Sequence, residues 1–560
     1  MKKVRPTVRA PLPSGIKLEE NVYVTMRDGV KIAVDVYHPT EKGSYPALVS
    51  MSPYIKEIQQ WPPVLTHSIE AGSTRFFVPK GYVHVIVQIR GTGMSQGQYD
   101  ILDKVQQEDG YELVEWAARQ PWCNGSVGMM GDSYFAMTQY MVAALQPPHL
   151  KCIAPCDGAT DLYRDFFYKG GIFNAWFFGF WAPDTYQQCV WPGPIKGKLP
   201  TAHFLEDLIT HTEDGPYWWE RSTWRRIDKI KVPVLSLVPG NSGYHLRGQL
   251  NAYPQIQSPK ILVVMQIGAP GGAHMMFMTN PVSELLLKWY DYWLKDIDTG
   301  IMDKPPVAIC DGATQEWRYE NEYPLARTKW TEFYLRSNPA GRATEPPYGL
   351  ISIEKPAEQE EPDRYITPES LISLSPTAAG KPAVAYTTQP LDKDVKVCGP
   401  ISATLYASST TFDTGWFIKL GDIAPNGNVA IITDGMLRAS HREVGKTESK
   451  PGQPFHPHKN PVFPEPNKVY EYQIELWPRF YTFKAGHKIW VQISSIDTNY
   501  QMQLHSVYTS EMLPIPAENT IYHDKARPSH LLLPVIPDTP TIKAVEPLLS
   551  KIKWPPREMV

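Results

Sequence analysis

The chain has few of the features that mark secreted, membrane-spanning or zinc-binding proteins. Its 560 residues include only six cysteines, which are widely scattered and form no second pair to complete a zinc site. The most apolar stretch, AWFFGFWA from Ala175 to Ala182, is much shorter than the roughly 20 residues that span a bilayer. No apolar core follows the basic residues at the N-terminus, as a secretory signal would require. We therefore expect a cytoplasmic protein with free, buried thiols.

An excess of charge of one sign is also missing. The chain has 55 Lys and Arg against 58 Asp and Glu, with no basic stripe, so a nucleic acid partner is not expected. It contains neither a G-x-x-x-x-G-K-[ST] loop nor an H-E-x-x-H pair, and we expect no cofactor and no metal. A hydrophobic content of 42% and a charged content of 20% are typical of a globular protein. The length is sufficient for two or three domains.

Three regions with different residue patterns follow one another along the chain. From Val22 to about Pro155, short apolar runs alternate with helical patterns, which is typical of a mostly parallel sheet covered on both faces. From about Thr160 to Arg226 the chain is rich in Trp and Phe and interrupts this pattern, which indicates an inserted helical cap. After about Thr328, apolar and polar residues alternate with a period of two, which predicts an all-β domain, a two-sheet sandwich.

One short stretch raises the question of catalysis. GMMGDSYFAMTQY, residues 128–140, predicts a strand, a sharp turn and a helix. Within it, residues 131–135 nearly match the nucleophile elbow G-x-S-x-G, but Phe135 stands where a glycine is expected. A serine before an apolar helix is also a common N-cap. The local pattern therefore leaves two interpretations of Ser133 open, a nucleophile and a helix cap.

A catalytic serine needs a base, and one histidine stands out. His274 follows the strong strand ILVVMQIG through a flexible loop, which is where an α/β-hydrolase places its base. His245, in the loop after the preceding strand, is the competitor.

Several longer motifs together resemble one family. VTMRDGVKIAVDVYHP, SPYIK, GYVHVIVQIRGTGMSQG, EWAARQPWCNGSVGMMGDSYFAMTQY and GPISATLYASSTTFDTGWFIKLGDIAPNG are similar to the cocaine-esterase-like (CocE/NonD) serine hydrolases. These are relatives of the X-Pro dipeptidyl peptidases and the α-amino acid ester hydrolases. The resemblance runs from about residue 18 to the C-terminus. It implies an α/β fold: an α/β-hydrolase domain with an inserted helical cap, followed by a C-terminal all-β jelly-roll domain.

The resemblance also implies roles for individual residues. Ser133 matches the family's nucleophile in G-x-S-Y-x-G, and His274 matches its base, although the usual G-P-W-x-H is here stretched to GAPGGAH. The hydroxyl of Tyr54, in a P-Y motif, and the backbone N–H of Tyr134 match the oxyanion donors.

The family's acid is missing from its usual place. Its G-W-Y-D motif follows the VPVL strand, but this chain has VPGNSGY at 238–244, without a carboxylate. Asp157, after the strand LKCIAPC, is the predicted replacement, and its carboxylate is expected to orient His274. Asp161 and a Ser–His dyad without an acid stay open as alternatives, with the Asn241 amide as a fallback. Asp165, like Asp161, is expected to have a structural role.

We therefore expect a serine hydrolase that cleaves carboxylic esters or activated amides through an acyl-serine. A Xaa-Pro dipeptidyl aminopeptidase is one alternative, with Glu70, Asp165 or Glu206 as an anchor for the substrate amine. A catalytically inactive binding protein is the other. We expect a small-molecule ester or a short peptide as the partner, and we expect no membrane partner. Whether the chain forms a homo-oligomer stays open. Aromatic residues of the cap are expected to line an acyl pocket: Phe166, Phe167, Trp176 and Phe177.

The expected domain boundaries follow the three regions with different residue patterns. The first part of the hydrolase domain covers 18–158, the helical cap 159–226, the second part of the hydrolase domain 227–328, and the β-sandwich 329–560.

Overall fold

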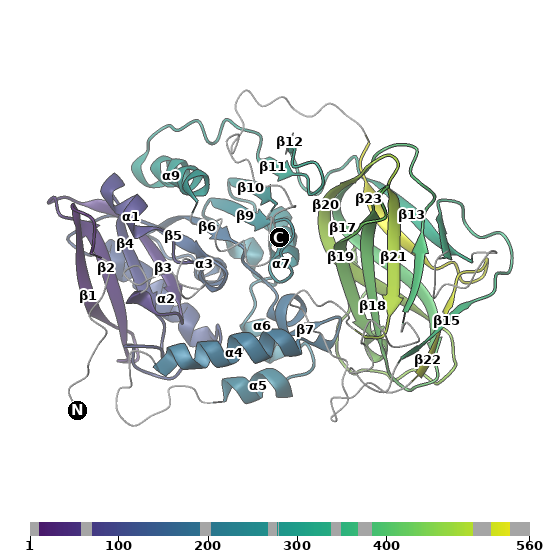
Figure 1. Ribbon diagram of the computed structural model, residues 1–560. Helices are drawn as coiled ribbons and strands as arrows, with labels where there is room; N and C mark the ends of the chain where they lie inside the picture. Colours follow the sequence, from purple (N-terminus) through teal and green to yellow (C-terminus); the bar gives the residue numbers. More distant parts are fainter. Residues whose placement is uncertain are drawn as a thin grey trace.

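The computed structural model describes residues 11–57, 70–190, 203–266, 277, 279–337, 349–367, 383–496 and 517–537. In Figure 1, an α/β part on the left stands beside a β part on the right. The α/β part comprises β1 to β12 with their helices, and the β part comprises β13 to β23. All six cysteines lie in the described residues and are buried free thiols, as predicted.

The α/β part is built on one mixed sheet. Its strands run parallel from β4 to β11, and antiparallel strands flank this block on both sides. Buried runs of Val, Ile and Met form these strands, as expected of a parallel sheet covered on both faces. In spatial order the strands are β1 (Ile16–Thr25), β2 (Lys31–Pro39), β4 (Val83–Gln88), β3 (Tyr45–Ser52), β5 (Cys123–Asp132), β6 (Leu150–Cys156), β9 (Val234–Pro239), β10 (Lys260–Met265), β11 (Val307–Cys310) and β12 (Trp317–Glu320).

Helices cover both faces of this sheet. Val49 of β3 joins a core with Tyr140 of α3, whereas the next residue back, Leu48, joins a separate core with Trp289 of α9. This alternation is the period of two of a strand buried on both sides. The helices around the sheet are α1 (Thr74–Phe77), α2 (Lys104–Ala118), α3 (Tyr134–Ala144), α7 (Leu246–Ala252) and α9 (Asn280–Lys295).

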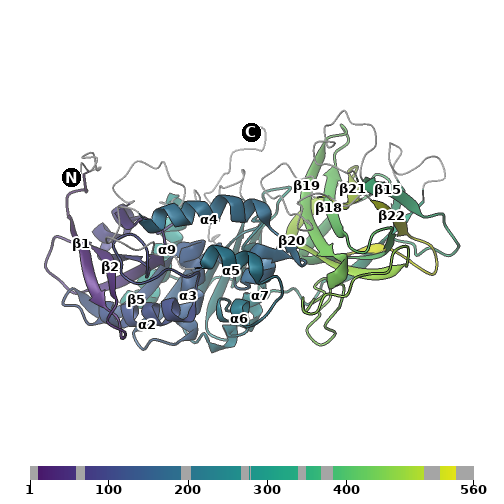
Figure 2. The same ribbon diagram turned by 90° about the horizontal axis from the view of Figure 1, so that it is seen from below.

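A separate segment is inserted between β6 and β9. Figures 1 and 2 show its helices α4 and α5 lying across one edge of the α/β part. Among the described residues, no helix combines the length and apolar character needed to cross a membrane. The segment consists of a π-helical turn (Tyr163–Phe167), β7 (Tyr168–Lys169), β8 (Ile172–Phe173), α4 (Ala175–Val190), α5 (Phe204–Thr210) and α6 (Pro216–Glu220).

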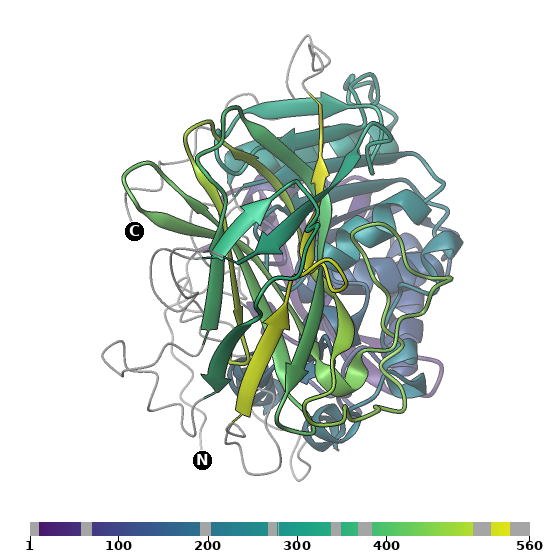
Figure 3. The same ribbon diagram turned by 90° about the vertical axis from the view of Figure 1, so that its right-hand side faces the viewer.

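The β part forms one continuous sheet that closes on itself. The long strand β17 pairs with β20, β22 and β23, and its pairing with β23 closes the ring. Figure 3 shows the green and yellow strands of this part facing the viewer. The described strands therefore form a barrel, whereas the sequence predicts two separate sheets; the irregular register of β17 near Gly399 lets it serve several neighbours. The strands are β13 (Lys329–Arg336), β14 (Gly349–Ser352), β15 (Asp363–Thr367), β16 (Ala383–Thr387), β17 (Val395–Ser409), β18 (Gly415–Ile423), β19 (Val429–Arg438), β20 (Tyr470–Phe483), β21 (Lys488–Ser494), β22 (Ala517–Tyr522) and β23 (His530–Val535).

Candidate active site

Ser133 forms the turn between β5 and α3. Its backbone has φ 59° and ψ −116°, a conformation that residues with a Cβ rarely adopt. The Ser133 N–H donates to the Cys156 carbonyl oxygen at 3.0 Å, which ties the turn to the end of β6. The side chain is half-buried and makes no capping hydrogen bond to α3 as the structure describes it. The helix-cap interpretation is thus excluded, and the strained turn is of the kind found at functional sites.

Gly131 explains why phenylalanine can replace the motif's second glycine. Gly131 has φ +141°, and a Cβ on it would lie 2.2 Å from the Cβ of Phe135. The same Cβ would lie 3.1 Å from the carbonyl oxygen of Glu70. Gly131 therefore supplies the space into which Phe135 fits, and the sharp turn does not depend on a glycine at position 135.

Tyr54 lies near the turn, two residues beyond the end of β3. Its ring centroid is 6.0 Å from those of Tyr134 and Phe135. The Tyr54 hydroxyl accepts a hydrogen bond from Trp181 Nε1 at 3.0 Å. Burial, followed by the charge of Glu70, raises the pKa of Tyr54 well above its usual value. The hydroxyl therefore keeps the proton that an oxyanion donor needs.

Tyr134 can contribute to the site only through its backbone. Its hydroxyl donates to Gln106 Oε1 at 3.0 Å and accepts from the Leu102 N–H at 3.2 Å, so its side chain is engaged elsewhere. Tyr134 is the first residue of α3. The first N–H groups of a helix have no acceptor within the helix. The Tyr134 amide is therefore a chemically suitable second donor to an oxyanion.

Asp157 contacts a histidine, but it is not the one assigned as base. Asp157 follows β6 in a left-handed conformation, φ 49°. Its Oδ2 lies 3.1 Å from Nδ1 of His245, the residue before α7, and both side chains are buried. His274 lies outside the described residues, so the bond between Asp157 and His274 stays a prediction. The sequence indicated both residues, Asp157 as the acid and His245 as the competing base, but it did not pair them; the adjacent strands β6 and β9 bring them together.

Asp161 and Asp165 are engaged in anchoring bonds instead. Asp161 Oδ2 lies 3.0 Å from Arg164 Nη1. Asp165 accepts backbone N–H groups of Thr160 and Asp161, and its Oδ1 lies 3.1 Å from Arg247 Nη1. These bonds fit the structural roles expected of both residues.

Three of the four expected pocket residues, Phe166, Phe167 and Phe177, belong to one aromatic cluster. Phe166 packs on Phe177 at 4.8 Å and on the ring of His245 at 4.8 Å between centroids. Phe167 contacts Phe177 at 5.8 Å. The side chain of Trp176 lies outside what the structure describes. The sequence did not single out Trp181, which stacks on Phe177 at 5.6 Å and links this cluster to Tyr54.

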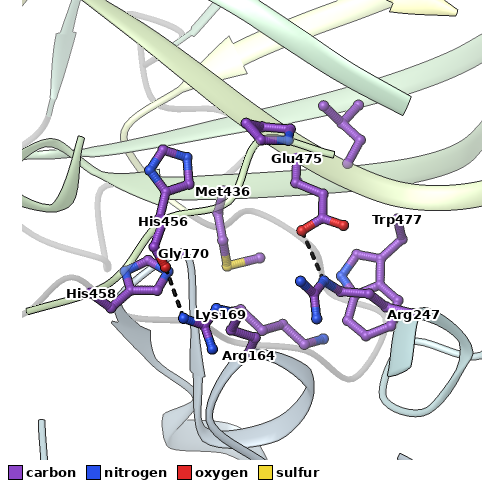
Figure 4. A pocket seen from close by; sticks show the side chains of 12 residues that line it. Arg164, Lys169, Gly170, Arg247, Met436, His456, His458, Glu475 and Trp477 are labelled. Atoms are coloured by element: carbon purple, nitrogen blue, oxygen red, sulfur yellow. Dashed lines mark hydrogen bonds and ion pairs between the residues drawn. The ribbon is translucent and has the colours of Figure 1, made fainter. Parts of the chain in front are cut away.

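A separate cavity lies where the inserted segment and α7 meet the β part (Figure 4). Arg164 Nη2 donates to the His456 carbonyl oxygen at 2.8 Å, and Arg247 Nε donates to Glu475 Oε2 at 2.8 Å. These are the two interactions drawn as dashed lines in Figure 4. Arg164 and Arg247 therefore hold the two parts together. We call this boundary between the inserted segment, α7 and the β part the seam.

The described residues contain no group of three or more His, Cys, Asp or Glu that is arranged to hold a metal ion. The described residues around the Ser133 turn present a hydroxyl, the His245 imidazole, the Asp157 carboxylate and hydrogen-bond donors.

Two family models match the chain. Residues 28–271 match the X-Pro dipeptidyl-peptidase (S15 family) model, and residues 299–532 match the X-Pro dipeptidyl-peptidase C-terminal non-catalytic domain. The first match contains Ser133, Tyr54, Asp157 and His245. The second match begins shortly before β11 and covers most of the β part.

Known proteins resemble the chain over nearly its whole length. A cocaine esterase from Rhodococcus sp. is 26% identical, over 92% of this chain and 98% of its own. A CocE/NonD family hydrolase structure from Staphylococcus aureus has a TM-score of 0.80 at 24% identity, covering 95% of this chain and 99% of its own. The structure of an aminopeptidase from a Thaumarchaeota archaeon has a TM-score of 0.74 at 18% identity, covering 96% and 99%. These likenesses confirm the coarse fold, an α/β-hydrolase with a second, C-terminal domain.

Proposed function

Because the chain belongs to the cocaine-esterase-like (CocE/NonD) family of serine hydrolases, we propose that it hydrolyses carboxylic esters or activated amides through an acyl-enzyme on Ser133. The observation that carries this assignment is the Ser133 turn. Its backbone is held at φ 59° and ψ −116° while its hydroxyl serves no capping bond. Folding alone gives no reason to keep a serine in this strained conformation.

In the proposed reaction, Ser133 Oγ attacks the substrate carbonyl carbon and a histidine takes the hydroxyl proton. The carbonyl oxygen becomes an oxyanion that accepts hydrogen bonds from the Tyr54 hydroxyl and the Tyr134 amide. Collapse of this intermediate breaks the bond to the alcohol or amine, which leaves with the proton from the imidazolium. Water then attacks the acyl-serine, gives a proton to the same histidine, and releases the acid and the free Ser133.

We assign His274 as this histidine, on its place after β10 and on its match to the family motif. A second assignment is supported by the 3.1 Å contact between His245 and Asp157. In it, His245 is the base and Asp157 holds its ring. Alanine variants of the two histidines separate the assignments, because only loss of the base removes nearly all turnover.

Peptide cleavage after Xaa-Pro is the second candidate function, favoured by the S15 family match. It needs a carboxylate for the substrate's free amine. Asp165 is bound to Arg247, and Glu206 is exposed near His203, so neither is suited to this role. Glu70 is fully buried and its charge acts on Tyr54, which makes it the strongest of the three named anchors.

The remaining assignments concern the protein as a whole. We propose a small-molecule ester as substrate, a jelly-roll arrangement of the C-terminal strands, and a cytoplasmic location. The closed, mostly antiparallel sheet supports the jelly-roll arrangement, and the six free thiols suit a reducing compartment such as the cytoplasm.

Hydrolysis of p-nitrophenyl esters, compared with hydrolysis of Ala-Pro-p-nitroanilide, tests the function. Wild-type protein is expected to cleave the esters, and Ser133→Ala is expected to lose on the order of 10⁶-fold in kcat. Cleavage of the dipeptide anilide with no ester hydrolysis would favour the aminopeptidase. Ester turnover that persists in Ser133→Ala would overturn the assignment of the nucleophile.

A further inference from the structure

We propose that Trp181 of helix α4 is a positioning residue that orients the oxyanion donor Tyr54. This inference rests on the proposed function, because it concerns the hydroxyl assigned to the oxyanion. Trp181 Nε1 donates to the Tyr54 hydroxyl oxygen at 3.0 Å, across 127 positions of sequence. The two side chains are 5% and 2% exposed, so water does not compete for the bond.

The direction of this bond determines what Tyr54 can do. An indole N–H is a donor only, so the tyrosine oxygen must be the acceptor. A phenol carries one proton, and Trp181 does not take it. The bond therefore restrains the rotation of the hydroxyl, and it does not itself occupy the O–H that would donate to an oxyanion. The pKa of Tyr54 is raised most by burial, and the Trp181 bond acts in the opposite direction. Accepting the indole N–H thus strengthens the O–H as a donor.

The indole ring is itself held in place. It stacks on Phe177 with centroids 5.6 Å apart and planes at 10°, and on Tyr134 at 6.4 Å and 18°. Phe167 contacts its edge at 6.3 Å. Trp181 therefore contacts the residues of both proposed oxyanion donors, one through its N–H and the other through its ring face. The position of α4 is in this way linked to the geometry of the oxyanion site.

The structure also offers a matched comparison. Trp219 in α6 of the same inserted segment donates its Nε1 to Asp214 Oδ1 at 2.9 Å, away from Tyr54. Trp219 is half-buried, whereas Trp181 is buried. If indole hydrogen bonds in this segment only stabilise folding, neither tryptophan should change turnover per active site when its N–H is lost. If Trp181 orients Tyr54, only its loss should change turnover per active site.

The test is a double-mutant cycle measured with an activated ester. Tyr54→Phe is expected to lower kcat by about 10²- to 10³-fold, the effect of removing one oxyanion donor. Trp181→Phe keeps an aromatic ring, removes the N–H, and is expected to lower kcat by about 10-fold with KM nearly unchanged. In the Tyr54→Phe background, Trp181→Phe should cause no further loss, because no hydroxyl remains to be oriented. Trp219→Phe should leave kcat unchanged.

Titration with a fluorophosphonate counts the reactive active sites in each preparation. Because kcat is then calculated per active site, unfolded protein does not lower it. Replacing Trp181 by 3-benzothienylalanine, which has the shape of tryptophan without the N–H, gives the same comparison if Trp181→Phe folds poorly. An equal loss of kcat with and without the Tyr54 hydroxyl would overturn the inference, as would wild-type kcat in both Trp181 variants. A fully active Tyr54→Phe would overturn the oxyanion assignment itself and the inference with it. A slow Tyr54→Phe with an unaffected Trp181→Phe would overturn only the inference.

Discussion

Asp157 and Asp161 are four residues apart and are buried to the same degree, yet they belong to two different regions of the molecule. Asp157 lies at the strand ends beside the Ser133 turn, where its Oδ2 is 3.1 Å from Nδ1 of His245. Its Oδ1 and both ring nitrogens of His245 have no hydrogen-bond partner among the described residues, so the 3.1 Å approach is a contact without hydrogen-bond geometry. Asp161 lies at the seam between the two parts, where it pairs with Arg164 at 3.0 Å.

The seam pairs its charged groups with one another, although Arg164 Nε and Glu475 Oε1 have no hydrogen-bond partner among the described residues. Arg164 bonds Asp161, Asp214 and the His456 carbonyl, and Arg247 bonds Asp165 and Glu475. Asp161 faces the permanent charge of an arginine, whereas Asp157 faces a histidine, a side chain that can take up and release a proton. The first kind of contact holds the fold, and the second is the contact that a catalytic acid makes. Variants at the two regions should affect different measured quantities.

The largest expected effect is the loss of turnover in Asp157→Asn. An asparagine keeps the shape and tolerates the left-handed backbone, but it loses the charge that orients a histidine. Loss of an orienting acid costs about 10⁴-fold in kcat, so kcat should fall toward that value while the melting temperature changes little. Asp161→Asn is the matched control, with lower stability and nearly unchanged kcat per active site. Equal kcat in both variants would show that Asp157 has no catalytic role.

The next effect is on stability, in Arg164→Met. Removing this arginine leaves Asp161 and Asp214 buried without their main partner. Breaking a buried pair in this way costs about 3 to 5 kcal/mol of unfolding free energy. Chemical denaturation should show that loss, while titrated active sites keep their kcat. A variant as stable as wild type would mean that the seam does not hold the two parts together.

The seam should also respond to acid. Burial, followed by the charges of Arg438 and His456, lowers the pKa of His441 to about 4. Between pH 6.5 and 4 the unfolded chain binds a proton that the folded protein does not, so stability is lost as the pH falls through this range. The loss reaches about 3 kcal/mol for this histidine. Over this range, the melting temperature of His441→Gln should therefore change less with pH than that of wild type.

His203→Gln is the control for this titration, because the His203 side chain is 78% exposed. Its dependence of melting temperature on pH should match that of wild type. If His441→Gln also matched wild type, the neutral buried state of His441 would be refuted.

The smallest expected effect is on acyl specificity, in Phe177→Ala. Phe177 is a half-buried member of the aromatic cluster and packs against Phe166 and Trp181. Its loss should reduce the preference for benzoyl over acetyl esters by about 10-fold in the ratio of kcat/KM. Phe173→Ala, on the adjacent β8, should leave the ratio unchanged. A ratio that is the same in all three proteins would remove the cluster from the acyl pocket.

The parts of the site that depend on local sequence could be predicted. A strand, a glycine and a serine before an apolar helix were sufficient to place Ser133 at a strand-to-helix turn. The strand-end positions of Tyr54 and Asp157 followed from apolar runs and the family motifs.

Long-range contacts could not be predicted in the same way. The hydrogen bond of Trp181 to Tyr54 and the contact of His245 with Asp157 join residues that no sequence pattern pairs. They depend on where α4 and α7 pack. The same holds for closure of the β part, which depends on β23 returning to β17 across a long stretch of chain.

Covalent labelling of Ser133 tests the central claim most directly. The protein is treated with a fluorophosphonate, the labelled peptide is identified by mass spectrometry, and Ser133→Ala is treated in parallel. A phosphonylated serine at position 133 in the native protein, with no labelling of the variant, is the predicted result. Labelling that persists in Ser133→Ala, or a native protein that does not react, would contradict the account of Ser133 as an activated nucleophile.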